Sequence, residues 1–126
     1  MSITLHTRRL AALHQGAAGA AQNANTLLRD YLGTPGADLA SDEYVDLRRA
    51  ARDAADKMDA AYLAYRRELT AALAAWAAAK PGDAVGTIWG PGVLVNRGTI
   101  AGFVRLHEGA AARRVEVEDV VSITAA

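Results

Sequence analysis

The chain has 126 residues, a formal net charge of zero and no cysteine. This length fits one domain, and the lack of cysteine excludes disulfide bonds and thiolate metal sites. Because basic and acidic side chains balance, no overall field draws the chain to nucleic acid or to an anionic membrane. Residues 1–9 lack the layout of a signal peptide, and residues 69–79, an alanine-rich apolar stretch without charge, are too short to cross a bilayer. We therefore expect a cytoplasmic protein with no membrane partner.

Apolar or small side chains recur every three or four residues over residues 3–32. The stripe contains Ile3, His6, Leu10, Leu13, Ala17, Ala20, Ala24, Leu27 and Tyr31. This spacing predicts an amphipathic helix with a seam for a partner helix. Ser2 or Thr4 can cap its start. Gly33, in a left-handed conformation, and Pro35 are expected to end it.

A second helix is predicted from Ser41 to Ala79. Ser41 is a good N-cap, and Asp42 and Glu43 place negative charge at the positive end of the helix dipole. Its apolar stripe contains Tyr44, Leu47, Ala51, Ala54, Met58, Ala61, Tyr65, Leu69, Ala72 and Trp76. Pro81 and the glycine after it end the helix.

The short connection between the two helices predicts that they are antiparallel neighbours. Pairing them about a centre near residue 37 places Ala20 and Ala24 opposite Ala54 and Ala51. Small side chains then face small side chains, so the helices can approach closely at this level.

The outward face of the second helix is strongly charged. Arg48, Arg49 and Arg52 alternate with acidic residues, and the pairs Arg49–Asp53 and Arg52–Asp56 have the four-residue spacing of weak intrahelical ion pairs. We interpret this face as solvated. The alternative, in which the three arginines bind phosphates or a carboxylate-rich partner, stays open.

Residues 81–126 have the pattern of a β-structure. Short runs rich in β-forming residues occur at residues 84–89, 93–95, 99–107, 114–118 and 120–123. Turns, most of them containing glycine, separate these runs. Alternation along one run predicts that Val115 and Val117 face the core and that Glu116 and Glu118 face outward. These runs indicate a small barrel that is closed or nearly closed.

Several short motifs of this last third are typical of one class of small barrel. They are Gly82-Asp83, the run from Gly98 to Gly102, Gly109, and the run from Val117 to Ile123. In these residues the region resembles the SH3-like barrels, including their KOW and Tudor relatives. The resemblance implies a barrel that binds peptides, nucleic acid or neighbouring subunits, although fold does not assign function.

The predicted fold class is therefore α+β, with a long antiparallel helical hairpin over residues 1–80 and a small SH3-like β-barrel over residues 81–126. So short a barrel buries little surface alone. We expect it to pack on the base of the hairpin through Trp76 and Trp89, with Leu5 or Leu10 joining the contact.

Patterns for catalysis or metal binding are absent from the sequence. His6, His14 and His107 have no ligand spacing, and no serine lies in a G-x-S-x-G context. The turn glycines lack the pattern of a phosphate-binding loop. We interpret Gly16 and Gly19 as small residues for close helix packing. We expect no enzyme activity, no cofactor and no bound metal.

A non-enzymatic protein-binding module is the function that we expect, such as an adaptor, assembly factor or inhibitor. The many arginines and alanines indicate a bacterial or phage genome. The small size and the lack of motifs are typical of accessory proteins of phages and plasmids, including inhibitors of host defence. The candidate contact residues are Tyr31, Leu32, Tyr44, Trp89 and Pro91.

Two alternatives stay open. In the first, the protein is a nucleic-acid accessory protein that binds phosphates through arginines. The candidates are Arg48, Arg49, Arg52, Arg97, Arg105, Arg113 and Arg114. In the second, the protein is a structural homo-oligomer that pairs through its alanine-rich seam.

Overall fold

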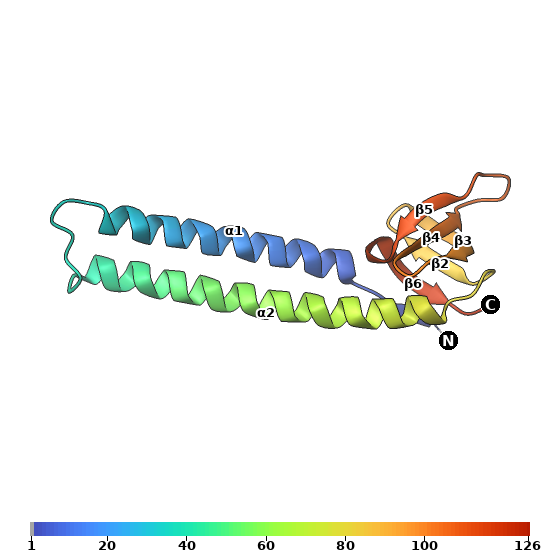
Figure 1. Ribbon diagram of the computed structural model, residues 1–126, viewed down its shortest axis with the longest axis horizontal. Coiled ribbons are helices and arrows are strands. Elements are labelled where there is room, and N and C mark those ends of the chain that lie inside the picture. The colour runs from blue at the N-terminus through green and yellow to red at the C-terminus, as the bar shows by residue number, and fades with distance from the viewer. Residues whose placement is uncertain (1) are drawn as a thin grey trace. The chain divides into compact units, whose positions relative to one another are not determined.

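The computed structural model describes residues 2–126 and contains two long helices and a six-stranded antiparallel sheet (Figure 1). The elements are β1 (Ser2–Thr4), α1 (Thr7–Leu32), α2 (Asp42–Ala78), β2 (Ala84–Thr87), β3 (Gly90–Arg97), β4 (Ala101–Arg105), β5 (Arg113–Glu116), the 3-10 helix η1 (Val117–Asp119) and β6 (Val120–Thr124). The α+β class is confirmed. The chain forms two compact units, one of residues 2–10 and 65–126 and the other Ala11–Ala64. Within residues 2–126, neither helix has an apolar stretch sufficient to cross a membrane.

The sheet has the strand order β1-β6-β2-β3-β4-β5. Buried residues face one another across it, as in the pairs Val85–Ile123 and Leu94–Val104. The expected closed barrel is not confirmed, because β1 and β5 are edge strands and no ladder joins them in the described chain. The alternation of Val115 and Val117 into the core is confirmed.

The first helix begins at Thr7, and the prediction that it starts near Ile3 is wrong. Ser2–Thr4 form β1 instead, which places Ile3 opposite Ile123. The Leu5 amide donates to the Val121 carbonyl at 2.8 Å, and the Leu5 side chain is buried in the core. Ser2 and Thr4 therefore do not cap a helix. The long-range pairing with β6 overrides a local pattern that suits a helix equally well.

The Ala11–Ala64 unit is an antiparallel helical hairpin. The rings of His14 and Tyr62 lie 5.2 Å apart at one end, and those of Tyr31 and Tyr44 lie 6.3 Å apart at the other. These two pairs confirm the predicted antiparallel pairing. Ala21 and Ala51 are the alanines that are fully buried within the unit.

The inward stripe of α1 differs from the prediction at every second position. Leu10, Ala17, Ala24 and Tyr31 are at least half-buried, as expected. Between them, His14, Ala21 and Leu28 turn inward, whereas Leu13, Ala20 and Leu27 are exposed. Each of these inward residues directly follows the apolar or small residue that was predicted to face inward. Spacing alone therefore does not decide which of the two neighbours is buried. The stripe of α2 is confirmed at every position.

Ser41 caps α2 as predicted, because its Oγ accepts the Tyr44 amide at 3.1 Å. Gly33 does not adopt the left-handed conformation, and that prediction is wrong. The Gly33 amide donates to the Arg29 carbonyl at 3.0 Å and continues the helical turn. Gly36 takes the positive φ angle, +78°, within the loop.

The runs of the β-region are confirmed as strands, with shifted boundaries. Gly90 and Pro91 were expected in a turn but begin β3, and the two-residue turn lies at Ile88 and Trp89. Thr87 stabilises this turn because its Oγ1 accepts the Trp89 amide at 3.1 Å and donates to the Gly90 carbonyl at 2.8 Å.

Trp76 of α2 lies at the centre of the core that covers the inner face of the sheet. Its side chain is fully buried, and its Nε1 donates to the Gly98 carbonyl at 3.0 Å. A Cβ atom at Gly102 would lie 2.8 Å from the Trp76 ring and 2.5 Å from the Asn96 carbonyl oxygen. Trp89 does not join this core, contrary to expectation, since it is 41% exposed.

Gly102 allows the indole to approach β4 closely, so Gly102→Ala should destabilise the protein. We expect a loss of roughly 1–3 kcal/mol in the free energy of unfolding, because the added methyl overpacks a rigid contact. Urea denaturation followed by circular dichroism measures it. A variant as stable as the unchanged protein would contradict the contact.

Gly16 and Gly19 do not mediate close helix packing, because nothing lies within 4 Å of a Cβ atom built at either position. Gly16→Ala and Gly19→Ala should each stabilise the protein by about 0.5–1 kcal/mol, since alanine restricts the unfolded chain and favours the helix. Thermal denaturation measures the gain. A loss of stability in either variant would contradict the open space around these two glycines.

Candidate functional site

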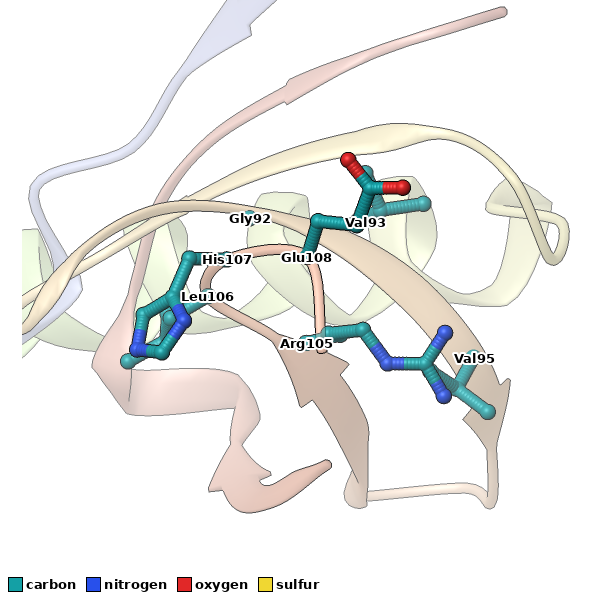
Figure 2. A pocket seen from close by; sticks show the side chains of 7 residues that line it. All are labelled: Gly92, Val93, Val95, Arg105, Leu106, His107 and Glu108. Carbon is teal, nitrogen blue, oxygen red and sulfur yellow. The ribbon is translucent and has the colours of Figure 1, made fainter. Parts of the chain in front are cut away.

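A pocket of about 290 Å³ opens between β3, β4 and the loop after β4. Its lining residues are Gly92, Val93, Val95, Arg105, Leu106, His107 and Glu108. Figure 2 shows these side chains, with Arg105, His107 and Glu108 extending from the end of β4 and from the loop. The pocket therefore combines an apolar floor with a charged rim.

Local backbone features of β3 shape this pocket. The pairing with β4 shifts register between Leu94 and Asn96, so Val95 has no partner in the ladder. Gly92 lets the two strands approach, because a Cβ atom there would lie 2.7 Å from the Arg105 carbonyl oxygen. Arg105 holds the loop through its Nε, which donates to the Ala110 carbonyl at 3.2 Å.

Trp89, a predicted contact residue, lies in the turn between β2 and β3. The guanidinium of Arg113, the first residue of β5, stacks 3.7 Å from its ring centroid. This cation–π contact covers one face of the indole. It also joins two segments that are not neighbours in the sheet, and Pro91 lies exposed beside the turn.

The structure does not gather the four arginines of the β-region into one basic patch. Arg97 donates to the carbonyls of Ala79 and Ala77 at 2.8 and 2.6 Å, so it binds the carboxyl end of α2. A cation there suits the negative end of the helix dipole. Arg114 pairs with Glu116 at 3.2 Å, and Arg105 and Arg113 make the contacts described above.

At the tip of the hairpin, Tyr31 orders the connecting loop. Its hydroxyl donates to the Asp38 carbonyl at 3.0 Å, accepts the Asp38 amide at 3.2 Å and lies 2.7 Å from Ser41 Oγ. Tyr44 is half-buried beside it, and Leu32 is exposed. Of the predicted contact residues at the tip, Leu32 thus has the most accessible side chain.

A second groove, of about 280 Å³, lies on the outward face of α2 near this tip. It is lined by Leu39, Tyr44, Val45, Arg48, Arg49 and Arg52. The structure brings the three predicted arginines together here, and it adds the exposed Leu39 and Val45, which sequence reasoning missed. Val45 has a signal in the sequence, because it precedes Arg48 by three residues and Arg49 by four. Leu39 lies in the loop before α2, nine residues before Arg48, and no local spacing points to it.

The intrahelical ion pairs predicted for these arginines are not formed. In the described chain, no ion pair joins Arg49 to Asp53 or Arg52 to Asp56. The guanidinium donors at this groove therefore face solvent.

Two buried carboxylates were also missed by sequence reasoning. Asp119 forms an ion pair with Arg8 and accepts the Glu116 amide at 3.2 Å. The hydrogen bond and the charge of Asp119 raise the pKa of Arg8. The Tyr65 hydroxyl binds the neighbouring Glu118. These contacts tie both helices to η1, just before the last strand, so we assign them a structural role.

Asp83 is the second buried carboxylate. It accepts the amides of Lys80 at 2.9 Å and of Ala126 at 3.1 Å, and thus joins the end of α2 to the end of the chain. These two hydrogen bonds, with the charge of Lys80, lower the pKa of Asp83 against the opposing effect of burial.

Because the folded pKa of Asp83 lies below its unfolded value of about 3.9, its contribution to stability is present above that value. The contribution is lost as the pH falls through the lowered folded pKa. Asp83→Asn should therefore lower the Tm at neutral pH, and the difference from the unchanged protein should shrink near pH 3. Thermal denaturation at both pH values measures it. A difference that is independent of pH would contradict the role of the charge.

No three histidine, aspartate or glutamate side chains converge as metal ligands within residues 2–126. His107 lies in the loop of the pocket and is exposed. The backbone amide of His6 donates to Glu68 at 2.6 Å.

Comparison of the chain with protein-family models, curated proteins and solved structures finds no match. The candidate surfaces thus rest on geometry alone. They are the β3–β4 pocket and the arginine groove of α2.

Proposed function

We propose that this protein is a non-enzymatic protein-binding module whose β3–β4 pocket receives an apolar side chain of its partner. The observation that supports this function is the apolar pocket on the outward side of the sheet. Val93 is 49% exposed there, with Val95 and Leu106 beside it. A partner side chain that covered these residues would remove their apolar surface from water.

The volume of the pocket favours a side chain over a small-molecule ligand. Cavities for cofactors and drug-sized ligands span roughly 300–1,000 Å³ and bury most of the ligand. A volume of about 290 Å³ is at the lower limit of that range, so one anchoring residue of a peptide fits better.

The charged rim fits the same role. Arg105 and Glu108 carry opposite charges at the border of the apolar floor. Protein interfaces commonly have an apolar centre surrounded by polar groups. A partner segment with an apolar anchor and charged neighbours would match both parts of this surface.

We further infer that β2 to β6 form a small barrel of the SH3-like kind. One contact supports a strong curl of the sheet. Arg113 of the edge strand β5 reaches the ring of Trp89 in the turn after β2, although these segments are not neighbours in the sheet. A peptide-binding role as adaptor, assembly factor or inhibitor is consistent with such a barrel.

The pocket is tested by selecting peptides on the full chain from a displayed random library and measuring their Kd by calorimetry. Val93→Asp should weaken the selected peptides by about tenfold or more, because it places a charge on the apolar floor. Val121→Asp is the matched control, since Val121 is also an exposed strand valine, at 39%, and lies outside the pocket. It should leave the Kd unchanged.

Equal weakening by both variants, or by neither, would contradict the pocket. Single-stranded DNA and RNA provide a further arm. Salt-sensitive binding of these nucleic acids, together with a failure to select peptides, would support the nucleic-acid alternative and overturn the proposed function.

A further inference from the structure

The outward face of α2 in the hairpin unit combines exposed apolar ends with charges that are sorted by sign. It consists of Val45, Arg48, Arg49, Arg52, Asp56, Asp59 and Leu63. Apart from the adjacent Arg48 and Arg49, these residues follow one another at intervals of three or four, so they share one side of the helix. The exposed Asp46, Asp53 and Lys57 lie on the flanks of this side. All of them are exposed, whereas Ala51, Ala54 and Met58 on the opposite side are at least half-buried.

This face is symmetric about Ala54. Val45 and Leu63 each lie nine residues from Ala54, and Arg52 and Asp56 each lie two residues from it. In an antiparallel pair of identical helices centred at Ala54, residues at equal distances on opposite sides meet. Val45 of one copy then lies against Leu63 of the other, and Arg52 lies against Asp56.

The flanking charges follow the same rule. Arg48 precedes Ala54 by six residues and Asp59 follows it by five. Both project from the same edge of the face, so they meet across an antiparallel pair. The two charge contacts, Arg52–Asp56 and Arg48–Asp59, therefore each join an arginine to an aspartate, with apolar contacts at the two ends.

Like charges lie near one another in a single copy. Arg52 is four residues from Arg48 and three from Arg49, and Asp56 is three residues from Asp59, so each of these pairs is repulsive. The described chain contains no ion pair that joins Arg52 to Asp56 within the helix. A second copy in the antiparallel register places the opposite charge against each cluster. The groove at Val45 also leaves about 280 Å³ for an apolar side chain.

We propose that two copies of the chain associate through this face of α2 as an antiparallel dimer with two-fold symmetry. Such an interface is isologous, since the same patch serves both copies. One helix face buries less surface than a stable interface requires, so the dimer should be weak and dependent on concentration. The proposal goes beyond the proposed function and uses a different surface, so either can fail without the other.

Charge reversal in the full-length protein tests the register. The acidic variant carries Arg48→Asp with Arg52→Asp, and the basic variant carries Asp56→Arg with Asp59→Arg. Each variant alone should be monomeric, because like charges meet across the interface. An equimolar mixture should form a 1:1 heterodimer, because opposite charges meet again. Sedimentation equilibrium up to about 1 mM protein measures each case, and circular dichroism checks the helix content of each variant.

The apolar ends are tested by a matched pair of leucines. Leu63 is 54% exposed on this face, and Leu13 is 55% exposed on α1. Leu63→Ser should raise the dimer dissociation constant about tenfold or more, whereas Leu13→Ser should leave it unchanged.

Three results would overturn the dimer. They are an unchanged protein that stays monomeric over the whole concentration range, a mixture of the two charge variants without heterodimer, and equal weakening by Leu13→Ser and Leu63→Ser. The peptide Kd at the β3–β4 pocket is independent of all three.

Discussion

The contact between the Trp76 indole and the backbone of β4 is the constraint on which the sheet-bearing unit depends. Trp76 supplies the largest fully buried side chain of the core. Its ring lies against Gly102, and its Nε1 binds Gly98 just before that strand. A sheet of such short strands buries too little surface alone. The carboxyl-terminal turns of α2 therefore complete its core, and Arg97 ties β3 to the same helix end.

The hairpin unit presents the opposite situation. Its seam is made largely of alanine and half-buried residues, so few large side chains leave water there. Its outward faces carry Leu13, Leu27 and Leu63, all exposed. Because so little apolar surface is buried inside this unit, a partner that covers its outward faces would stabilise it. The charges of α2 are complementary to those of a second, antiparallel copy of the same helix. The sheet unit offers a different surface, an apolar pocket with a charged rim, so the two units present separate contact chemistries.

Arginines illustrate how the same residue type takes different roles in this chain. Arg8 and Arg97 bind a buried carboxylate and a helix end, and Arg113 stacks on Trp89. These three are held by contacts within the chain. By contrast, Arg48 and Arg52 face solvent beside a groove. Position in the sequence does not separate the two groups, because Arg8, Arg97 and Arg113 find their partners in distant segments, whereas no ion pair of Arg48 or Arg52 occurs within residues 2–126.

Local patterns in the sequence determined the two helices, the Ser41 cap, the antiparallel pairing and the strands after Gly82, because helical and strand periodicities are local properties. Tertiary structure decided what local spacing leaves undetermined. Pairing with β6 made Ser2–Thr4 a strand, and packing chose Ala21 and Leu28 over their neighbours as inward residues. Likewise, Asp119 and Asp83 bind residues far apart in the chain, Arg8 and Ala126. The β3–β4 pocket lies within residues 92–108, but it depends on the register shift between β3 and β4. Such sites depend on which segments of the chain come into contact, and local sequence patterns do not show these contacts.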